Sequence, residues 1–120
     1  MRQAQGDHMN KGRVRSTIRM LIPLDKQSEA LDILGSVSAQ IQFEPSCISS
    51  RIYRGVDEVR AIMVEELWAN EEDILRHVKS DAYRWVLLVI EMAEEPPEIR
   101  FDTIAGSSGV EIIEKARKQA

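Results

Sequence analysis

The chain has 120 residues, of which 43% are hydrophobic and 30% charged, so it can bury one core without covalent cross-links. Its net charge of −4 argues against a general nucleic-acid binder, which needs a concentrated basic face. The single cysteine, Cys47, excludes an intrachain disulfide, and no apolar run approaches the roughly 20 residues that cross a bilayer, so we expect a cytoplasmic protein.

The chain is expected to divide into one domain with an extension at each end. Residues 1–13 hold polar side chains without a hydrophobic period, which predicts a flexible N-terminal extension. Periodic segments begin at residue 14 and continue to residue 105. We therefore expect a folded domain over residues 14–105 and a C-terminal helix or tail over residues 106–120.

The first two elements differ clearly in their hydrophobic period. Residues 14–22 alternate between apolar and polar side chains, which predicts a strand that ends at Pro23. Over residues 25–43, apolar side chains recur at steps of three and four. This spacing predicts a helix with one buried stripe, which Pro45 prevents from continuing.

A hairpin follows this helix. Residues 47–54 and 58–68 are rich in β-branched and aromatic side chains and are separated by a turn at residues 55–57. Two such runs joined by a short turn predict a pair of antiparallel strands.

The second half of the chain predicts two helices, a strand and a last helix. Asn70 is a favourable N-cap, and the three acidic residues after it suit the first turn of a helix. The helix caps again near Ser80, and residues 83–92 are apolar on nearly all sides, which requires burial on more than one face. Residues 98–105 predict a fourth strand, and residues 108–120 an amphipathic helix. The residues of this last helix expected to face inward are Val110, Ile113 and Ala116.

This order of elements predicts an α+β, ferredoxin-like βαββαβ fold with a four-stranded antiparallel sheet and an extra C-terminal helix. With helices on one face, the opposite face meets water or a partner. Strand parity assigns to this open face Arg15, Thr17 and Arg19, then Ser49, Arg51 and Tyr53, and on the third strand the Trp68 parity with Arg60, Ile62, Val64 and Glu66.

Such a face is too apolar for water and too charged for a dry core. We therefore expect a homodimer, a dimeric α+β barrel in which two sheets enclose a cavity with polar walls. An open-faced sandwich with a hydrated sheet is the alternative, and a shift of one residue in register would exchange the two faces.

One residue of the predicted domain, His77, suits proton transfer near neutral pH. The other histidine, His8, lies in the predicted extension, so we expect no preformed metal site. The plainer interpretation of His77 is a partly exposed helix histidine near carboxylates, and that of Trp68 is an anchor in the core or in a dimer interface.

Three short segments carry a resemblance to a known family. Residues 66–80 read Glu-Leu-Trp-Ala-Asn-Glu-Glu-Asp-Ile-Leu-Arg-His-Val-Lys-Ser, a strand ending in an acid and an aromatic and then a capped helix with histidine and serine. Residues 43–47 (Phe-Glu-Pro-Ser-Cys) precede the second strand, and residues 97–101 (Pro-Glu-Ile-Arg-Phe) begin the last. Over residues 14–105 the chain resembles the antibiotic biosynthesis monooxygenase (ABM) domain family, with Ser46 where glycine is usual.

The resemblance implies a ferredoxin-like domain that dimerises through its sheet and holds a pocket in each protomer. Some members oxygenate quinols or other phenols with molecular oxygen and without flavin or metal, because a deprotonated phenol is electron-rich enough to reduce oxygen. The resemblance then implies no cofactor and a small aromatic substrate. The implied site residues are His77 as the base, Trp68 as a wall, and Arg51, Tyr53 and Arg19 as substrate-binding residues.

Two alternatives stay open. The first is a non-catalytic dimeric domain that binds a small apolar ligand or a protein partner, because no second catalytic group is evident. The weaker one is a haem-degrading monooxygenase, whose relatives use an asparagine on strand one, a tryptophan ending strand three and a histidine on the second helix. Trp68 matches this pattern, but the first strand has no asparagine and His77 comes a helical turn or more too early.

Overall fold

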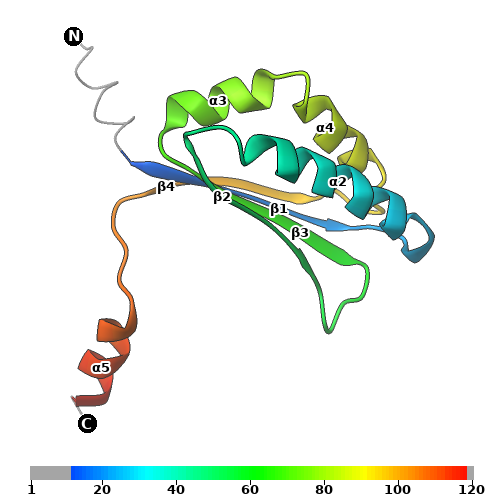
Figure 1. Ribbon diagram of the computed structural model, residues 1–120. Helices are drawn as coiled ribbons and strands as arrows, with labels where there is room; N and C mark the ends of the chain where they lie inside the picture. The colour runs from blue at the N-terminus through cyan, green and yellow to red at the C-terminus, as the bar shows by residue number, and fades with distance from the viewer. Residues whose placement is uncertain (1–11, 119–120) are drawn as a thin grey trace.

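The computed structural model describes residues 12–118 and shows a four-stranded antiparallel sheet with helices packed on one face (Figure 1). The strands, in the order β2-β3-β1-β4, are β1 (Arg13–Leu21), β2 (Cys47–Arg54), β3 (Ala61–Trp68) and β4 (Glu98–Ile104). The helices are η1 (Leu24–Lys26), α2 (Gln27–Ile41), α3 (Glu71–Lys79), α4 (Tyr83–Glu91) and α5 (Val110–Lys118). This arrangement confirms the ferredoxin-like fold. Residues 1–11 of the expected N-terminal extension lie outside the described part of the chain.

Strand β1 follows the alternation seen in its sequence. Its even-numbered residues are buried beneath the helices and its odd-numbered residues lie on the opposite face. The buried side chains on this strand are Val14, Ser16, Ile18 and Met20. Because β1 pairs with both β3 and β4, it is a central strand, and its register fixes which face each neighbour presents to the helices.

The third strand was expected to turn Trp68, and the residues on the same side of the strand, away from the helices. This expectation is wrong. Val14 lies opposite Trp68 and Ile18 lies opposite Val64, and directly paired residues share a face of the sheet. Trp68 therefore lies under the helices, where Ile62, Val64 and Glu66, on the same side of β3, are also buried. The open face of β3 carries Met63, Glu65 and Leu67 instead.

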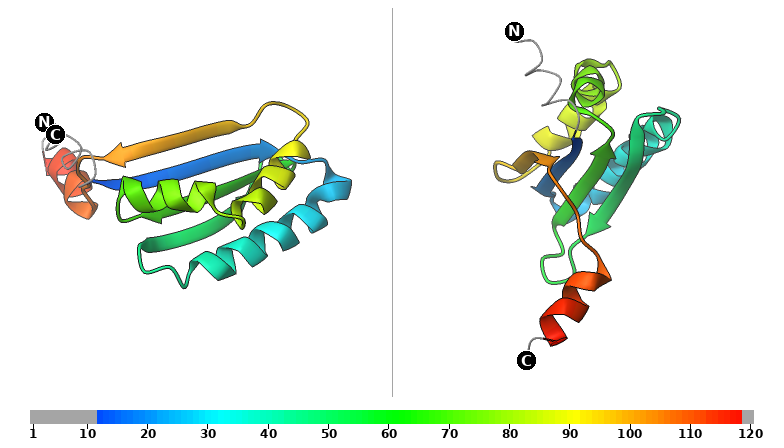
Figure 2. Two further views of the ribbon diagram at one scale, coloured as in Figure 1. Left: turned by 90° about the horizontal axis from the view of Figure 1, so that it is seen from above. Right: turned by 90° about the vertical axis from the view of Figure 1, so that its left-hand side faces the viewer.

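The helix layer covers the middle of the sheet and leaves one edge bare. Helix α2 buries a stripe of Ala30, Leu34, Val37 and Ile41, and α4 buries Tyr83, Val86 and Val89. Figure 2 shows β4 at the edge of the sheet, beyond the cover of the helices. Two apolar side chains on the helix side of β4, Ile99 and Phe101, are consequently 45% and 48% exposed.

Helix α5 is formed as expected, but its apolar residues do not face inward. Val110 and Ile113 are 63% and 59% exposed, and Ala116 is exposed with every other residue of the helix. The reason is the segment after β4, which leads off the sheet and carries α5 to the side opposite α2, α3 and α4 (Figure 1). No helix within residues 12–118 is long and apolar enough to span a membrane.

Candidate functional site

Helix α3 sets the position of His77. The Oδ1 of Asn70 accepts a hydrogen bond of 2.8 Å from the backbone N–H of Asp73, which caps the first turn. Ile74 and His77 then follow at a spacing of three residues, on the face of α3 that is buried against the sheet. The imidazole is therefore held by a capped helix and not by a loop.

Three rings pack together between the sheet and the helices. The His77 ring stacks on Trp68 with a centroid distance of 4.9 Å, and the ring of Tyr83 meets it edge-on at 5.2 Å. Each comes from a different element, namely β3, α3 and α4, and each is at least 93% buried. Aromatic pairs in these geometries are favourable beyond the area they bury, so the imidazole has a defined orientation.

A buried carboxylate lies beneath these rings. Glu66 is 5% exposed, and its Oε1 accepts a hydrogen bond of 2.9 Å from Nε1 of Trp68. The same oxygen lies 3.4 Å from Nε2 of His77. That nitrogen is buried and has no hydrogen-bond partner among the described residues. Glu66 is thus the carboxylate on which the tryptophan and the histidine converge.

The carboxylate and the surrounding burial raise the pKa of two neighbouring groups. Burial, with the negative charge of Glu66, raises the pKa of Tyr83 to about 12. Burial and the same charge raise the pKa of Cys47 to about 11. The phenol and the thiol are therefore protonated at neutral pH, so neither is prepared to act as a base or as a nucleophile.

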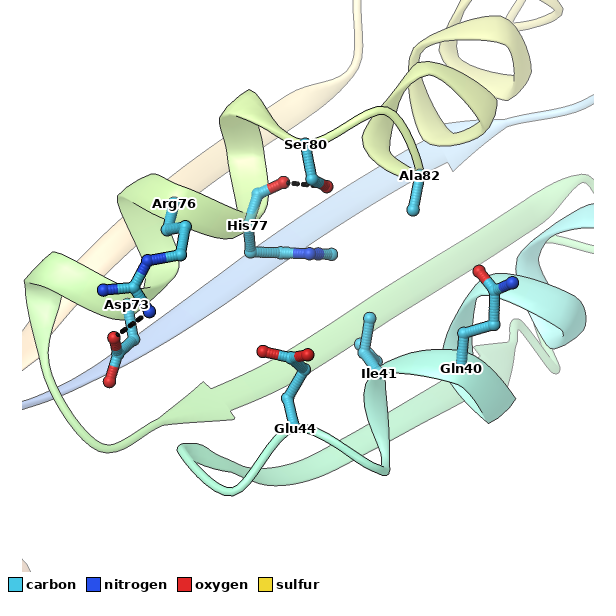
Figure 3. A pocket seen from close by; sticks show the side chains of 8 residues that line it. All are labelled: Gln40, Ile41, Glu44, Asp73, Arg76, His77, Ser80 and Ala82. Atoms are coloured by element: carbon cyan, nitrogen blue, oxygen red, sulfur yellow. Dashed lines mark hydrogen bonds and ion pairs between the residues drawn. The ribbon is translucent and has the colours of Figure 1, made fainter.

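A pocket of about 280 Å³ opens beside His77, between α3 and the C-terminal end of α2 (Figure 3). Six of its eight lining residues have polar or charged side chains, and the full set is Gln40, Ile41, Glu44, Asp73, Arg76, His77, Ser80 and Ala82. Hydrogen bonds from Ser46 and Asn70, together with the Arg76 guanidinium, lower the pKa of Asp73. The Asp73 carboxylate is therefore charged and engaged by these partners, and His77 is the histidine that lines this pocket.

The structure divides the site residues expected from the sequence into two groups. His77 and Trp68 come together under the helices, as described above. Arg51, Tyr53 and Arg19 lie on the open face of the sheet, where Arg51 is paired with Glu65 across β2 and β3. The sheet separates the two groups, so within one chain they do not line the same cavity. The physical reason is the register of β3 against β1, which places Trp68 on the helix side of the sheet.

Two residues of the cluster were missed by the sequence reasoning. Glu66 lies two residues before Trp68 on the same face of β3, so the acid shares the burial of the tryptophan. Tyr83 was expected in a buried helix but without a partner in the site. Within residues 12–118, no group of three or more His, Cys, Asp or Glu side chains is arranged to hold a metal ion.

The family model of the antibiotic biosynthesis monooxygenases matches residues 13–86, which include β1 to α3 and the cluster around His77. The chain belongs to the ABM family. None of the curated proteins compared with this ABM chain matches it.

Solved structures share the fold at low sequence identity. A protein from Caulobacter crescentus CB15, which carries the provisional name antibiotic biosynthesis monooxygenase, superposes with a TM-score of 0.74 and 16% identity, covering 87% of this ABM chain and 100% of its own. A conserved protein from Methanosarcina mazei Go1 gives 0.72 and 18%, covering 81% and 97%. Rv0793 from Mycobacterium tuberculosis gives 0.72 and 17%, covering 81% and 99%. At these identities the likeness establishes the fold.

Proposed function

We propose that this ABM protein is a monooxygenase that oxidises a quinol or a similar electron-rich aromatic with molecular oxygen, without a cofactor, and with His77 as the base. The observation that carries the proposal is the position of His77. Its imidazole lines an open pocket, stacks on Trp68 and has a buried carboxylate behind it. A general base oriented by a second group is the arrangement that phenol deprotonation needs.

The proposed reaction needs little from the protein beyond proton transfer. His77 removes a proton from a substrate hydroxyl, and the resulting anion is electron-rich enough to reduce oxygen. For a quinol, one oxygen atom enters the ring to give a hydroxyquinone and the other leaves as water. The four electrons that reduce the oxygen molecule come from the quinol itself, so atoms and electrons balance.

The size and walls of the pocket limit the substrate. A volume of about 280 Å³ lies near the lower end of the range of ligand pockets, which suits one or two fused rings. Gln40, Glu44 and Arg76 supply polar groups at the rim that can bind hydroxyl or carbonyl oxygens. We therefore expect a mono- or bicyclic quinol and not a large polycyclic phenol.

The open face of the sheet has a different proposed role. Tyr53 and Met63 pair across β2 and β3 on this face, and Leu67 lies farther along β3, beyond the cross-strand pair of Arg51 and Glu65. Arg19, on β1, lies beside Met63. We propose that this face packs against a second copy of the chain. In this arrangement the substrate-binding roles expected for Arg51, Tyr53 and Arg19 are replaced by roles in the interface, because the sheet separates them from the His77 pocket.

Oxygen consumption with a reduced naphthoquinone tests the catalytic proposal. The purified protein, mixed under air with 2-methyl-1,4-naphthoquinol, should consume oxygen faster than the enzyme-free solution. His77→Gln fills the same space but cannot take the proton, so it should lower kcat by about 100-fold. An uptake rate equal to that of the enzyme-free solution would contradict the proposal.

A further inference from the structure

We propose that Glu66 is the positioning residue of the His77 pocket. In this role the carboxylate holds Nε2 of His77, so that Nδ1 is the nitrogen that meets a ligand. The catalytic value of this contact rests on the proposed function of His77 as a base. The contact itself is a property of the free protein and is testable without a substrate.

The burial of Nε2 supports this assignment. Nε2 of His77 is enclosed, has no hydrogen-bond partner among the described residues, and lies 3.4 Å from Oε1 of Glu66. A ligand in the pocket beside α3 therefore cannot reach Nε2. Because His77 lines that pocket, Nδ1 is the ring nitrogen left for the ligand.

The chemistry of a carboxylate fixes the direction of the proton. An ionised carboxylate only accepts hydrogen bonds, so a proton between Glu66 and His77 is carried by Nε2. The Nδ1 lone pair is then free to accept a proton from a ligand, and the imidazolium that forms gains a charge-assisted hydrogen bond to Glu66. The same Oε1 also accepts from Nε1 of Trp68 at 2.9 Å, so one oxygen aligns both stacked rings.

The other charged and titratable groups around the His77 ring do not replace Glu66 as the partner of Nε2. Asp73 and Arg76, on the same helix, form an ion pair of 2.6 Å with each other. Tyr83, on α4, is protonated at neutral pH because its pKa is raised to about 12. Glu44, in the loop after α2, lies on the opposite wall of the pocket (Figure 3).

Tryptophan fluorescence of the free protein gives a direct test. The chain has two tryptophans, and Trp85→Phe leaves Trp68, stacked on His77, as the sole emitter. Protonation of His77 places a cation over the indole face and should quench its emission as the pH falls. In the Glu66→Gln variant the quenching should begin at a pH lower by about half a unit or more, because the cation loses its counter-charge.

Two further variants make the fluorescence result decisive. Glu65→Gln removes the adjacent carboxylate on the open face of the same strand, so its quenching should follow that of the Trp85→Phe parent. Glu66→Asp keeps a carboxylate, so its quenching should begin near the pH seen for the Trp85→Phe parent. This variant also supplies a second comparison if Glu66→Gln folds poorly. Quenching curves that coincide for the Glu66→Gln, Glu66→Asp and Glu65→Gln proteins would overturn the assignment.

Kinetics separates this assignment from the proposed function. If the wild type consumes oxygen with the quinol, Glu66→Gln should lower kcat by about 10-fold or more with little change in KM, and the acid limb of its pH–rate profile should move to lower pH. A fluorescence shift without oxygen uptake by the wild type would support the contact and contradict the monooxygenase. Oxygen uptake by the wild type, with no fluorescence shift and an unchanged pH–rate profile in Glu66→Gln, would support the monooxygenase and contradict the positioning role of Glu66.

Discussion

Glu66 is an unusual residue to find under a helix layer. A carboxylate withdrawn from water costs several kcal/mol unless hydrogen bonds compensate for the lost hydration. Here the indole of Trp68 donates to it and the imidazole of His77 lies beside it. Buried titratable groups that perturb their neighbours gather at functional sites, and Glu66 perturbs both Tyr83 and Cys47. This cluster of interacting groups, more than any single residue, is why we place the site here.

The phenol of Tyr83 has a consequence for stability at high pH. Its pKa in the folded protein is about 12, against an ordinary value of 10.0, so the unfolded chain releases this proton first. The unfolding free energy should therefore fall between pH 10 and pH 12, by up to about 2 kcal/mol from this group. Urea unfolding of the wild type and Tyr83→Phe should show a smaller fall in the variant. Tyr53→Phe, which removes the phenol on the open face of the sheet, serves as the control and should show the same fall with pH as the wild type.

At the scale of elements, the start of α3 connects stability to the site. Asn70→Ala removes the side chain that accepts from the Asp73 backbone, and the loss of such a cap costs about 1 kcal/mol. Chemical denaturation should show this loss, with Asn70→Ser close to the wild type because serine also caps. Asn70→Ala should also weaken the stacking of His77 on Trp68, since α3 carries the imidazole. Equal stabilities of the alanine and serine variants would contradict the assigned cap.

The elements themselves were largely predictable from the sequence, whereas the face of one strand was not. Alternation on β1 and the cap at Asn70 are local signals, and the structure confirms both. Strand β3 carries apolar residues and an acid on each parity, with Glu65 on one side and Glu66 on the other. Its face is decided by pairing with β1, which is a long-range property. The cluster of His77 with Trp68 was therefore found, but its place under the helices was not.

At the scale of the whole molecule, the helices leave one face of the sheet without cover. Two arginines of β1 form ion pairs on this face, Arg19 with Glu98 of β4 at 3.4 Å and Arg15 with Glu65 of β3 at 3.9 Å. Tyr53 and Met63, which pair across β2 and β3, and Leu67 farther along β3 lie among these charges. Helix α5 extends on the same side of the sheet, with its apolar residues exposed (Figure 1). A face on which apolar side chains alternate with both signs of charge is suited to a second copy related by a two-fold axis.

The proposed homodimer predicts a specific sensitivity at Leu67. This side chain is half-buried on the open face, opposite Arg15 on one neighbouring strand and Ser49 on the other. Leu67→Arg would place an unpaired cation beside Arg15 in the proposed interface of both copies, so we expect the dimer dissociation constant to rise by about 10-fold or more. Sedimentation equilibrium over a range of concentrations measures this constant.

The matched control for that measurement is Leu75→Arg on α3. Leu75 is 54% exposed on the helix side of the molecule, so the same change of chemistry there should leave the dissociation constant unchanged. A wild type that sediments as a single chain at all concentrations would contradict the homodimer. Equal weakening by both substitutions would place the interface elsewhere. Because the His77 pocket lies on the helix side of the sheet, Leu67→Arg should leave the quenching curve of Trp68 unchanged. That result would mean that each protomer holds a complete pocket.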